Sequence, residues 1–424
     1  MRFLCFTAFL WSASLVSLNM FSASTAGAGD NWPEFRGPGG DGRSDSVGLP
    51  TTWSESEHIR WKTAIHGKAW SQPVIWGKQV WLTTAPADGK SMWAVCVDKE
   101  SGKITRDIKI FDISEPQFCH EFNSYASSTP AIEAGRIYCH FGTHGTACLD
   151  TGTGEVLWRR EDLHCNHFRG AGSSPILFEN LLIVNFDGYD VQFVVALDKK
   201  TGQTVWKKDR NIDYGIHNND GDQKKGYGTP SVFDINGQMQ LISPSAGATI
   251  AYNPLTGEEI WRVNSGGMNA AARPIYGHGL VFANSAAGGF KEFALRPNGH
   301  GDVTATHVAW KFGNAMPSRP SPILDGDDLY LIDDKGVASC LEASTGKLRW
   351  SKRIGGDYSA SPVYADGKIY FCSQDGDMPV LKVDPDKCDV IAKNHLDGAF
   401  MASPAISGKA LFARTKTHLY RIEN

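Results

Sequence analysis

The chain has 424 residues, with 42 Lys or Arg against 46 Asp or Glu, which gives a formal net charge of −4. This slightly acidic balance and the absence of a basic block argue against nucleic acid as the main partner. After the first 28 residues no stretch is apolar enough to cross a bilayer, so the mature protein is not expected to span a membrane.

Residues 1–28 have the pattern of a secretory signal peptide. Arg2 is followed by an apolar stretch, Phe3 to Met20, and then by small residues ending in Ala26-Gly27-Ala28, which predicts cleavage near Ala26 or Ala28. A transmembrane anchor is the alternative interpretation. A lipoprotein would need a Cys beside the cleavage point, and the only Cys in this stretch is Cys5. We therefore expect an exported protein, periplasmic or extracellular.

Residues 29–57 are rich in Gly, Pro and Ser and have no strand periodicity. Such a composition is typical of an irregular, extended segment. We expect this segment to lie as an arm on the rest of the protein, pinned by Trp32, Phe35 and Trp53.

From residue 58 onward a unit of four short strands repeats. In the clearest copy, Ser173 to Trp206, four β-branched and aromatic runs are separated by Gly, Asp and Asn turns, which is typical of an antiparallel meander. A Pro that opens the first strand recurs eight times, at Pro73, Pro130, Pro175, Pro230, Pro274, Pro322, Pro362 and Pro404. Four strands per unit of about forty to fifty residues predict an all-β, eight-bladed propeller of four-stranded antiparallel blades, forming one domain over residues 58–424.

The last unit, Pro404 to Asn424, has room for only three strands. The segment from His58 to Ile65 carries Trp61, which matches the Trp that other units have on their fourth strand. We therefore expect this N-terminal strand to complete the last blade and to close the ring.

Three of the eight cysteines after the signal segment share one position in the repeat. Cys96, Cys148 and Cys340 stand near the end of strand three, where other units have Ala196 and Ala251. This position predicts small, buried residues. Cys139 is expected to face Cys148 across a hairpin, either as two packed thiols or as a disulfide.

Cys119 and Cys165 lie in loops between neighbouring blades and are the better disulfide candidates. His120, His164 and His167 stand beside them in the chain, so a soft-metal site is a second interpretation if the two loops meet. The sequence leaves both interpretations open.

In a propeller the loops that lead into strand one surround one mouth of the channel. Nearly every unit has an aromatic residue or an Arg there: Trp70, Tyr125, Arg169, Tyr227, Arg273, Arg319, Tyr358 and Phe400. We predict a ligand site at this mouth, with rings that stack on a planar ligand and three Arg that bind carboxylates or phosphates. The alternative is that the rings pack between blades and the Arg pair with Asp187, Asp190, Asp333 or Asp334.

The longest of these loops, Asp213 to Tyr227, brings Asp213, Asn219, Asp220 and Asp222 close together. Oxygen ligands at this density suit Ca²⁺, but the spacing lacks the calcium-hand pattern, so a solvated turn is predicted. The sequence has no nucleophile elbow, phosphate loop or zinc-protease helix.

The segment ALDKKTGQTVW, Ala196 to Trp206, resembles the repeat of the pyrroloquinoline quinone (PQQ) propellers. Asn123 to Pro130 and Arg414 to Glu423 are similar to segments of exported PQQ-like propellers of bacteria. The resemblance points to two branches. Quinoprotein alcohol dehydrogenases use PQQ and calcium, whereas the outer-membrane assembly lipoprotein binds no quinone and acts as a scaffold. Neither PQQ nor calcium is firmly implied, because the chain has no adjacent Cys-Cys pair and lacks the long insertions of the dehydrogenases.

A complete repeat without a catalytic constellation favours an exported, monomeric binding or scaffold module. Its expected partner is an envelope protein or a small anionic or carbohydrate ligand at the channel mouth. One alternative is a PQQ-dependent oxidoreductase acting on alcohols or sugars. Another is a carbohydrate-binding propeller that uses Trp70, Tyr125 and Tyr358.

Overall fold

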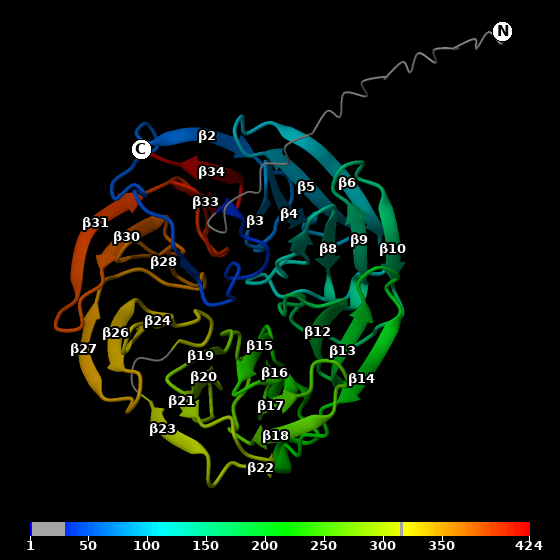
Figure 1. The fold of residues 1–424 in the computed structure, drawn as a ribbon, viewed down its shortest axis with the longest axis vertical. Coiled ribbons are helices and arrows are strands. Elements are labelled where there is room, and N and C mark those ends of the chain that lie inside the picture. Colours follow the sequence, from blue (N-terminus) through cyan, green and yellow to red (C-terminus); the bar gives the residue numbers. More distant parts are fainter. Residues whose placement is uncertain (2–29, 314–316) are drawn as a thin grey trace.

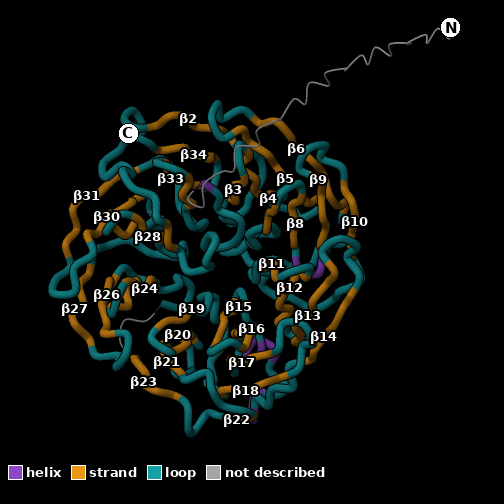
Figure 2. The backbone as a smooth tube through the Cα atoms, viewed as in Figure 1, coloured by secondary structure: helices purple, strands orange, loops and turns teal. Residues whose placement is uncertain are grey.

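The structure is a computed structural model that describes Met1, residues 30–313 and residues 317–424. Eight sheets surround a central channel (Figure 1), which confirms the predicted eight-bladed propeller. Helix within the described ranges is limited to short 3-10 turns (Figure 2), namely η2 (Gly142–His144), η3 (Gly215–His217), η4 (Gly221–Lys224) and a 3-10 residue at Asp30. The predicted signal peptide, apart from Met1, lies outside the described residues.

Each blade has four antiparallel strands, which follow one another along the chain in most blades, and the first strand of the repeat lies nearest the channel (Figure 1). Blades 1 to 3 comprise β3 (Val74–Trp76), β4 (Gln79–Thr84), β5 (Ser91–Asp98) and β6 (Ile104–Asp112); β7 (Ala131–Glu133), β8 (Arg136–His140), β9 (Thr146–Asp150) and β10 (Val156–Arg160); and β11 (Ile176–Phe178), β12 (Leu181–Asp187), β13 (Gln192–Asp198) and β14 (Thr204–Asp209). Blades 4 and 5 comprise β15 (Ser231–Ile235), β16 (Gln238–Pro244), β17 (Thr249–Tyr252) and β18 (Glu259–Val263); and β19 (Ile275–Gly277), β20 (Leu280–Asn284), β21 (Glu292–Leu295) and β23 (Val308–Phe312).

The remaining blades follow the same order. Blades 6 to 8 comprise β24 (Ile323–Asp325), β25 (Asp328–Ile332), β26 (Val337–Glu342) and β27 (Leu348–Arg353); β28 (Val363–Ala365), β29 (Lys368–Tyr370), β30 (Asp377–Lys382) and β31 (Asp389–His395); and β32 (Ala405–Ser407), β33 (Ala410–Arg414), β34 (His418–Ile422) and β2 (Ile59–Ala64). Two blades gain a short parallel strand, because β22 (Gly301–Asp302) pairs with β18 and β1 (Arg43–Ser44) pairs with β28.

The eighth blade takes its outermost strand from the start of the propeller. β2 pairs antiparallel with β34, with Ala64 opposite His418 and Trp61 opposite Arg421. The two ends of the propeller therefore share one sheet, and β2 covers the edge that β34 would otherwise expose.

A tryptophan on strand four ties five blades to the next one. Each indole N–H donates a hydrogen bond of 2.9–3.1 Å to a carbonyl in the turn between strands three and four of the following blade. The pairs are Trp61 with Lys99, Trp158 with Lys199, Trp206 with Pro254, Trp310 with Ala343 and Trp350 with Asp384. A buried ring with a satisfied N–H is a strong contact between neighbouring sheets.

The small position of strand three lies directly opposite this tryptophan. Cys148 faces Trp158 and Cys340 faces Trp350, as Ala196 faces Trp206. Cys96, Cys148 and Cys340 are fully buried, as predicted. Burial raises the pKa of all three thiols, which keeps them protonated at neutral pH.

The expected contact between Cys139 and Cys148 is wrong. In the β8–β9 pair, Cys139 lies opposite Ala147 and Cys148 lies opposite Tyr138. Successive side chains on a strand point to opposite faces, so this one-residue difference in register separates the thiols. Cys139 packs with blade 1 and Cys148 packs with blade 3.

The core consists of apolar clusters between adjacent blades. In the cluster between blades 2 and 3, Val184, Val195 and Leu197 of blade 3 pack with Tyr138 and Trp158 of blade 2. Among the described residues, no helix has the length and apolarity that crossing a bilayer requires.

Candidate functional site

The residue before the Pro of each innermost strand lies on the channel wall, and these residues are linked around the ring. The backbone N–H of one donates to the side-chain hydroxyl of the next at 2.8–3.0 Å. The bonds run from Gln72 to Thr129, Thr129 to Ser174, Ser174 to Thr229, Arg273 to Ser321, Ser321 to Ser361 and Ser361 to Ser403. The hydroxyls therefore fix the spacing of the blades around the axis.

Two of the eight positions carry a long side chain instead of a hydroxyl, and both bind the N-terminal arm. The Gln72 amide oxygen accepts the backbone N–H of Arg36 at 2.8 Å. The Arg273 guanidinium donates to the Glu34 carboxylate at 2.7 Å and to the carbonyl of Phe35. The arm is thus held by the two places where the hydroxyl pattern is interrupted.

Residues 31–44 of the arm lie across the channel. Trp32 pairs with Ile75 of blade 1, and the carbonyl of Pro33 accepts from Ile132 of blade 2 at 2.8 Å. The fully buried guanidinium of Arg36 donates to backbone carbonyls of Ser321 and Pro322 in blade 6. The arm therefore contacts inner strands on several sides of the ring.

Gly40 allows the closest approach of arm and wall. Its φ is +66°, and a Cβ there would lie 2.5 Å from the guanidinium carbon of Arg273. A residue with a side chain would meet both backbone strain and a direct collision. Glycine at this position is therefore required for Arg273 to reach Glu34.

The arm lines two cavities, one toward each end of the channel. The mouth cavity, of about 480 Å³, is lined by Phe35 from the arm and by the loops that lead into strand one. The opposite cavity, of about 330 Å³, is lined by Glu34, Arg273 and the apolar side chains of Trp76, Phe178 and others. Small-molecule sites in proteins span about 300–1,000 Å³, so the mouth cavity is large enough for a ligand.

Four of the seven predicted site residues line the mouth cavity, namely Trp70, Arg169, Tyr227 and Arg319. The other three do not. The Tyr125 hydroxyl donates to the carbonyl of Gln117 at 2.7 Å, and Tyr358 is 1% exposed and packs against Phe371. Both of these rings therefore fill space between loops.

The expected convergence of three arginines on one mouth is wrong for Arg273. Its side chain is 3% exposed and lines the opposite cavity, where Glu34 pairs with it. The repeat pattern placed Arg273 correctly in the ring, but its side chain follows the arm, which does not belong to any repeat.

The two arginines of the mouth are each paired with a carboxylate. Arg169 lies 2.8 Å from Asp222, and Arg319 lies 3.2 Å from Asp334. Arg319 also lies over the ring of Phe122, with its guanidinium carbon 4.8 Å from the ring centre. The alternative prediction of Arg–Asp pairing at neighbouring hairpins therefore holds for Asp334. The two Arg and the two Asp together give the rim of the mouth no excess positive charge.

Two polar atoms of the lining residues lack a partner. The Nε of Arg319 and the amide oxygen of Asn269 are buried and make no hydrogen bond with the described residues. An unpaired buried donor or acceptor costs free energy, about 1–3 kcal/mol. A bound molecule that offers one acceptor and one donor would satisfy both.

Sequence reasoning missed Phe122, Asn269 and the hydroxyls of the channel wall, which also line the mouth cavity. Phe122 stands in a loop with little pattern. The hydroxyls, by contrast, belong to the Ser or Thr that stands before the repeated Pro, so this recurring position was a signal that could have identified them.

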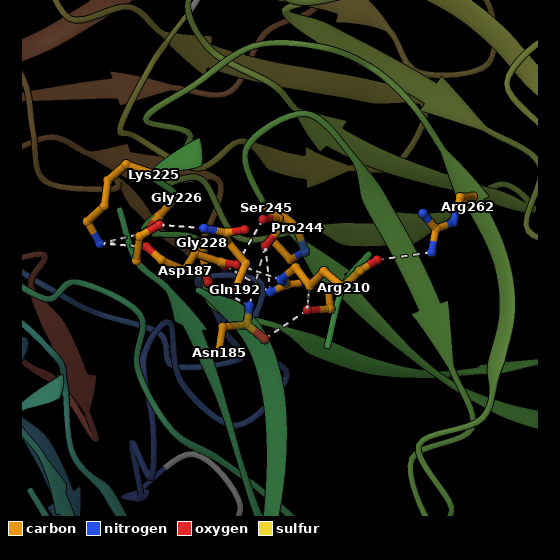
Figure 3. A network of polar contacts seen from close by, with 12 residues as sticks. Asn185, Asp187, Gln192, Arg210, Lys225, Gly226, Gly228, Pro244, Ser245 and Arg262 are labelled. Carbon is orange, nitrogen blue, oxygen red and sulfur yellow. Dashed lines mark hydrogen bonds and ion pairs between the residues drawn. The ribbon is translucent and has the colours of Figure 1, made fainter. Parts of the chain in front are cut away.

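A buried polar network supports the loop that carries Tyr227. Arg210 and Asp187 point toward each other and are both fully buried, with a 2.5 Å contact (Figure 3). The ammonium of Lys225 donates to the carbonyl of Asp187 at 2.7 Å and lies 3.2 Å from the His167 ring. Burial lowers the pKa of Lys225 to about 8. These contacts fix the loop two residues before Tyr227.

The Cys and His residues of the neighbouring loops do not form the expected pairings. All eight cysteines of the described residues are free, including Cys119 and Cys165. Cys165 contacts His167 at 3.3 Å, whereas Cys119 lies against the carbonyl of Arg169. Within the described ranges no three His, Cys, Asp or Glu side chains gather closely enough to hold a metal ion. The disulfide and soft-metal interpretations of these loops are therefore both wrong.

The carboxylates of the acidic loop 213–227 accept hydrogen bonds from the loop itself or pair with a neighbouring Arg. Asp213 accepts from the backbone of Gly215, and Asp220 accepts from the backbone of Asp222 at the start of η4. Asp222 pairs with Arg169. The carboxylates satisfy local donors and do not converge on one point.

Comparison with known proteins agrees with the fold. The family profile described as "Outer membrane protein assembly factor BamB" matches residues 115–211 and 245–391. The chain belongs to this family. The resemblance to PQQ-repeat propellers is thereby confirmed.

Relatives of this BamB-family chain fall in both expected branches. It is 22% identical over 309 residues to the quinohemoprotein alcohol dehydrogenase ADH-IIG of Pseudomonas putida, covering 68% of this chain and 39% of that protein. It is 24% identical over 251 residues to the outer membrane protein assembly factor BamB of Shewanella oneidensis, covering 54% and 57%. The chain thus spans less than two thirds of the length of these curated relatives.

Two solved structures share the propeller. BamB from Moraxella catarrhalis superposes with a TM-score of 0.60 at 14% identity, covering 86% of this chain and 99% of that chain. The quinohemoprotein alcohol dehydrogenase of Comamonas testosteroni gives 0.66 at 11% identity, covering 94% and 81%. At these identities the likeness concerns the fold alone.

The residues of the mouth do not fit a calcium-dependent quinone site. A Ca²⁺ ion needs several converging oxygen ligands. Within the described part of this BamB-family chain, no three Asp, Glu, His or Cys side chains gather closely enough to hold such an ion. Arg169 and Arg319 are already paired with Asp, and Glu34 occupies Arg273. No quinone chemistry is derived from this site.

Proposed function

We propose that this chain is a binding propeller of the cell envelope, exported as a monomer, that holds a ligand or a segment of a partner protein at its channel mouth. The outer membrane assembly role in the names of two relatives supports an envelope location. The propeller is the rigid frame, and the loops around the mouth cavity provide the contacts.

The observation that carries this proposal is the chemistry of the mouth cavity. It combines aromatic side chains, Trp70, Phe122 and Tyr227, with the unpaired Arg319 Nε and Asn269 oxygen. Apolar walls with a few converging polar groups are typical of ligand sites. The opposite cavity differs, because its buried charges, Glu34 and Arg273, pair with each other.

Hydrogen bonds behind the lining hold Tyr227 and Trp70 in place. Tyr227 follows Lys225, which the buried Asp187 network anchors, and the Trp70 indole donates to the carbonyl of Phe122 at 3.1 Å. A preorganised site binds with a smaller entropy cost.

The test is a thermal-shift screen of neutral sugars, carboxylates, phosphates and short peptides, together with a pull-down from an envelope extract. Three proteins are compared: the mature chain, a Trp70→Ala/Tyr227→Ala variant of the mouth, and a Phe178→Ala control in the opposite cavity. We expect at least one compound class or envelope protein to bind the mature chain and the control but not the mouth variant. Binding that is equal in all three proteins, or no binding at all, would contradict the proposal.

A further inference from the structure

The wall of the mouth cavity carries an arc of hydroxyl donors without acceptors. Thr129, Ser174, Thr229 and Ser403 line the cavity, and each hydroxyl accepts a backbone N–H from the preceding blade. None of the four donates a hydrogen bond to another described residue. A hydroxyl has one hydrogen to donate in addition to its lone pairs. The arc therefore offers four O–H donors to a ligand that carries acceptors.

The same cavity also needs a donor from its ligand. The buried amide oxygen of Asn269 has no partner, and each wall hydroxyl keeps a second lone pair after accepting one backbone N–H. The buried Nε of Arg319, in contrast, needs an acceptor. A ligand whose polar groups both donate and accept matches this mixture, whereas a carboxylate or phosphate accepts only.

The charges around the cavity do not call for an ionic ligand. Arg169 and Arg319 are balanced by Asp222 and Asp334 at 2.8 and 3.2 Å. An anion would have to compete with these carboxylates, and it would lie close to Asp334, which lines the cavity itself. A neutral ligand can hydrogen-bond to the edges of both pairs without separating the charges.

Aromatic rings complete the lining. Trp70 and Phe122 are neighbours, since the Trp70 indole donates to the carbonyl of Phe122, and Tyr227 stands in the loop two residues after Lys225. Phe122 is 39% exposed, and Phe35 of the arm adds a further ring to the lining. Flat apolar rings beside polar groups suit a molecule with apolar C–H faces and polar edges.

We infer that the mouth cavity is a carbohydrate site that takes one or two neutral pyranose units of a glycan, with the sugar faces on the aromatic rings and the sugar hydroxyls on the wall hydroxyls, Arg319 and Asn269. This inference rests on the proposed function and names the ligand class. It differs from the sequence-based carbohydrate hypothesis, because Tyr125 and Tyr358 make no contribution.

The experiment is a glycan array probed with the fluorescently labelled mature protein, followed by calorimetric titration with the neutral di- or trisaccharide that gives the strongest signal. Trp70→Ala and Tyr227→Ala are each expected to weaken binding at least tenfold, and Trp70→Phe is expected to restore most of it. Phe178→Ala, in the opposite cavity, is expected to leave the affinity unchanged. Circular dichroism of each variant shows whether it is folded.

The Asn269→Asp variant distinguishes whether the bound ligand is neutral or anionic. Asp also tolerates the left-handed backbone of this residue, whose φ is +61°. A carboxylate here still accepts from a sugar hydroxyl, so affinity for the sugar is expected to change less than threefold, and to vary little between low and high salt. The affinity for an acidic ligand would fall at least tenfold.

The outcomes are distinct. If the mouth binds carboxylates, phosphates or peptides and no neutral glycan, the carbohydrate inference is wrong and the binding function stands. If nothing binds in either screen, both are wrong. Glycan binding that survives Trp70→Ala and Tyr227→Ala places the sugar elsewhere and also overturns the inference.

Discussion

Arg273 is expected to stabilise the fold through the arm and to have no part in binding at the mouth. The Arg273→Met variant keeps the apolar bulk but removes the bonds to Glu34 at 2.7 Å, to the Phe35 carbonyl and to the Ser231 hydroxyl at 3.0 Å. The side chains of Arg273 and Glu34 are 3% and 14% exposed. Removing one member of a buried pair leaves the other charge unpaired, which costs about 3–5 kcal/mol.

The magnitude is measured by urea unfolding in a double-mutant cycle with Glu34→Gln. The Gln retains a hydrogen bond to Arg273 but removes the charge that balances the buried guanidinium, so this single change is also expected to cost about 3 kcal/mol. The double variant leaves no unpaired charge, and it is therefore expected to be more stable than the sum of the two single losses predicts. Arg319→Met is the matched control, since its partly exposed pair with Asp334 should contribute about 0–1 kcal/mol.

Additive losses in the cycle would refute the coupling between arm and channel wall. So would an Arg273→Met variant that loses less than the Arg319→Met control. A third result against this reasoning would be a glycan or other mouth ligand whose affinity falls in Arg273→Met, because the arm and Phe35 separate that side chain from the mouth cavity.

Truncation of the chain through Thr63 removes most of β2, so the last blade loses its outermost strand. We expect cooperative unfolding to be lost. A truncated protein that melts like the mature chain would contradict ring closure. Replacing Cys96, Cys148 or Cys340 by Ala should lower the free energy of unfolding by no more than about 1–2 kcal/mol each, since Ala already fills this position in other blades. Labelling of any of the three by a thiol reagent in the native state would show that the position is not buried. Burial raises the pKa of Glu292 to about 8, against 4.5 for a free side chain. The unfolded chain therefore releases this proton near pH 4.5 while the folded chain keeps it, so the contribution of Glu292 falls as the pH rises between these values. Glu292→Gln should flatten the stability curve over that range, and an unchanged curve would show that the carboxyl is not buried in its neutral form.

The repeat made the fold predictable because a propeller blade is defined by local features. Strand runs, Gly turns and the strand-four Trp each recur at one place in the unit, and burial of the small position opposite Trp158, Trp206 and Trp350 follows from that pattern. The register of strand pairing within a hairpin was harder to predict from the sequence. A single residue in the η2 loop decides whether Cys139 and Cys148 meet, and the sequence does not show where the pairing ends.

The loop class that forms the mouth was also predictable, but the direction of each side chain in it was not. Trp70, Arg169, Tyr227 and Arg319 reach the cavity, while Tyr125 and Tyr358 turn into the protein to fill space between loops. An aromatic residue stands in the same loop of the repeat whether its ring reaches the cavity, as in Trp70 and Tyr227, or packs between loops, as in Tyr125 and Tyr358. Only the volume left by neighbouring loops decides between them, and that volume depends on residues far apart in the chain.

The arm is the largest element that periodicity could not place, yet the repeat contained a signal for it. Six of the eight residues before the repeated Pro are Ser or Thr, and all six hydroxyls accept the backbone N–H of the corresponding residue in the preceding blade. Gln72 and Arg273 are the two exceptions. A ring that tolerates a buried Arg must supply it with an acceptor, because an unpaired guanidinium in the channel would be strongly destabilising. The repeat units provide no carboxylate for Arg273, so the acceptor had to come from a segment outside them. Glu34 is such a carboxylate, in a segment rich in Gly and Pro that can lie in a narrow channel without forming a strand of its own. Departures from a repeat are therefore where contacts with non-repeated segments should be sought.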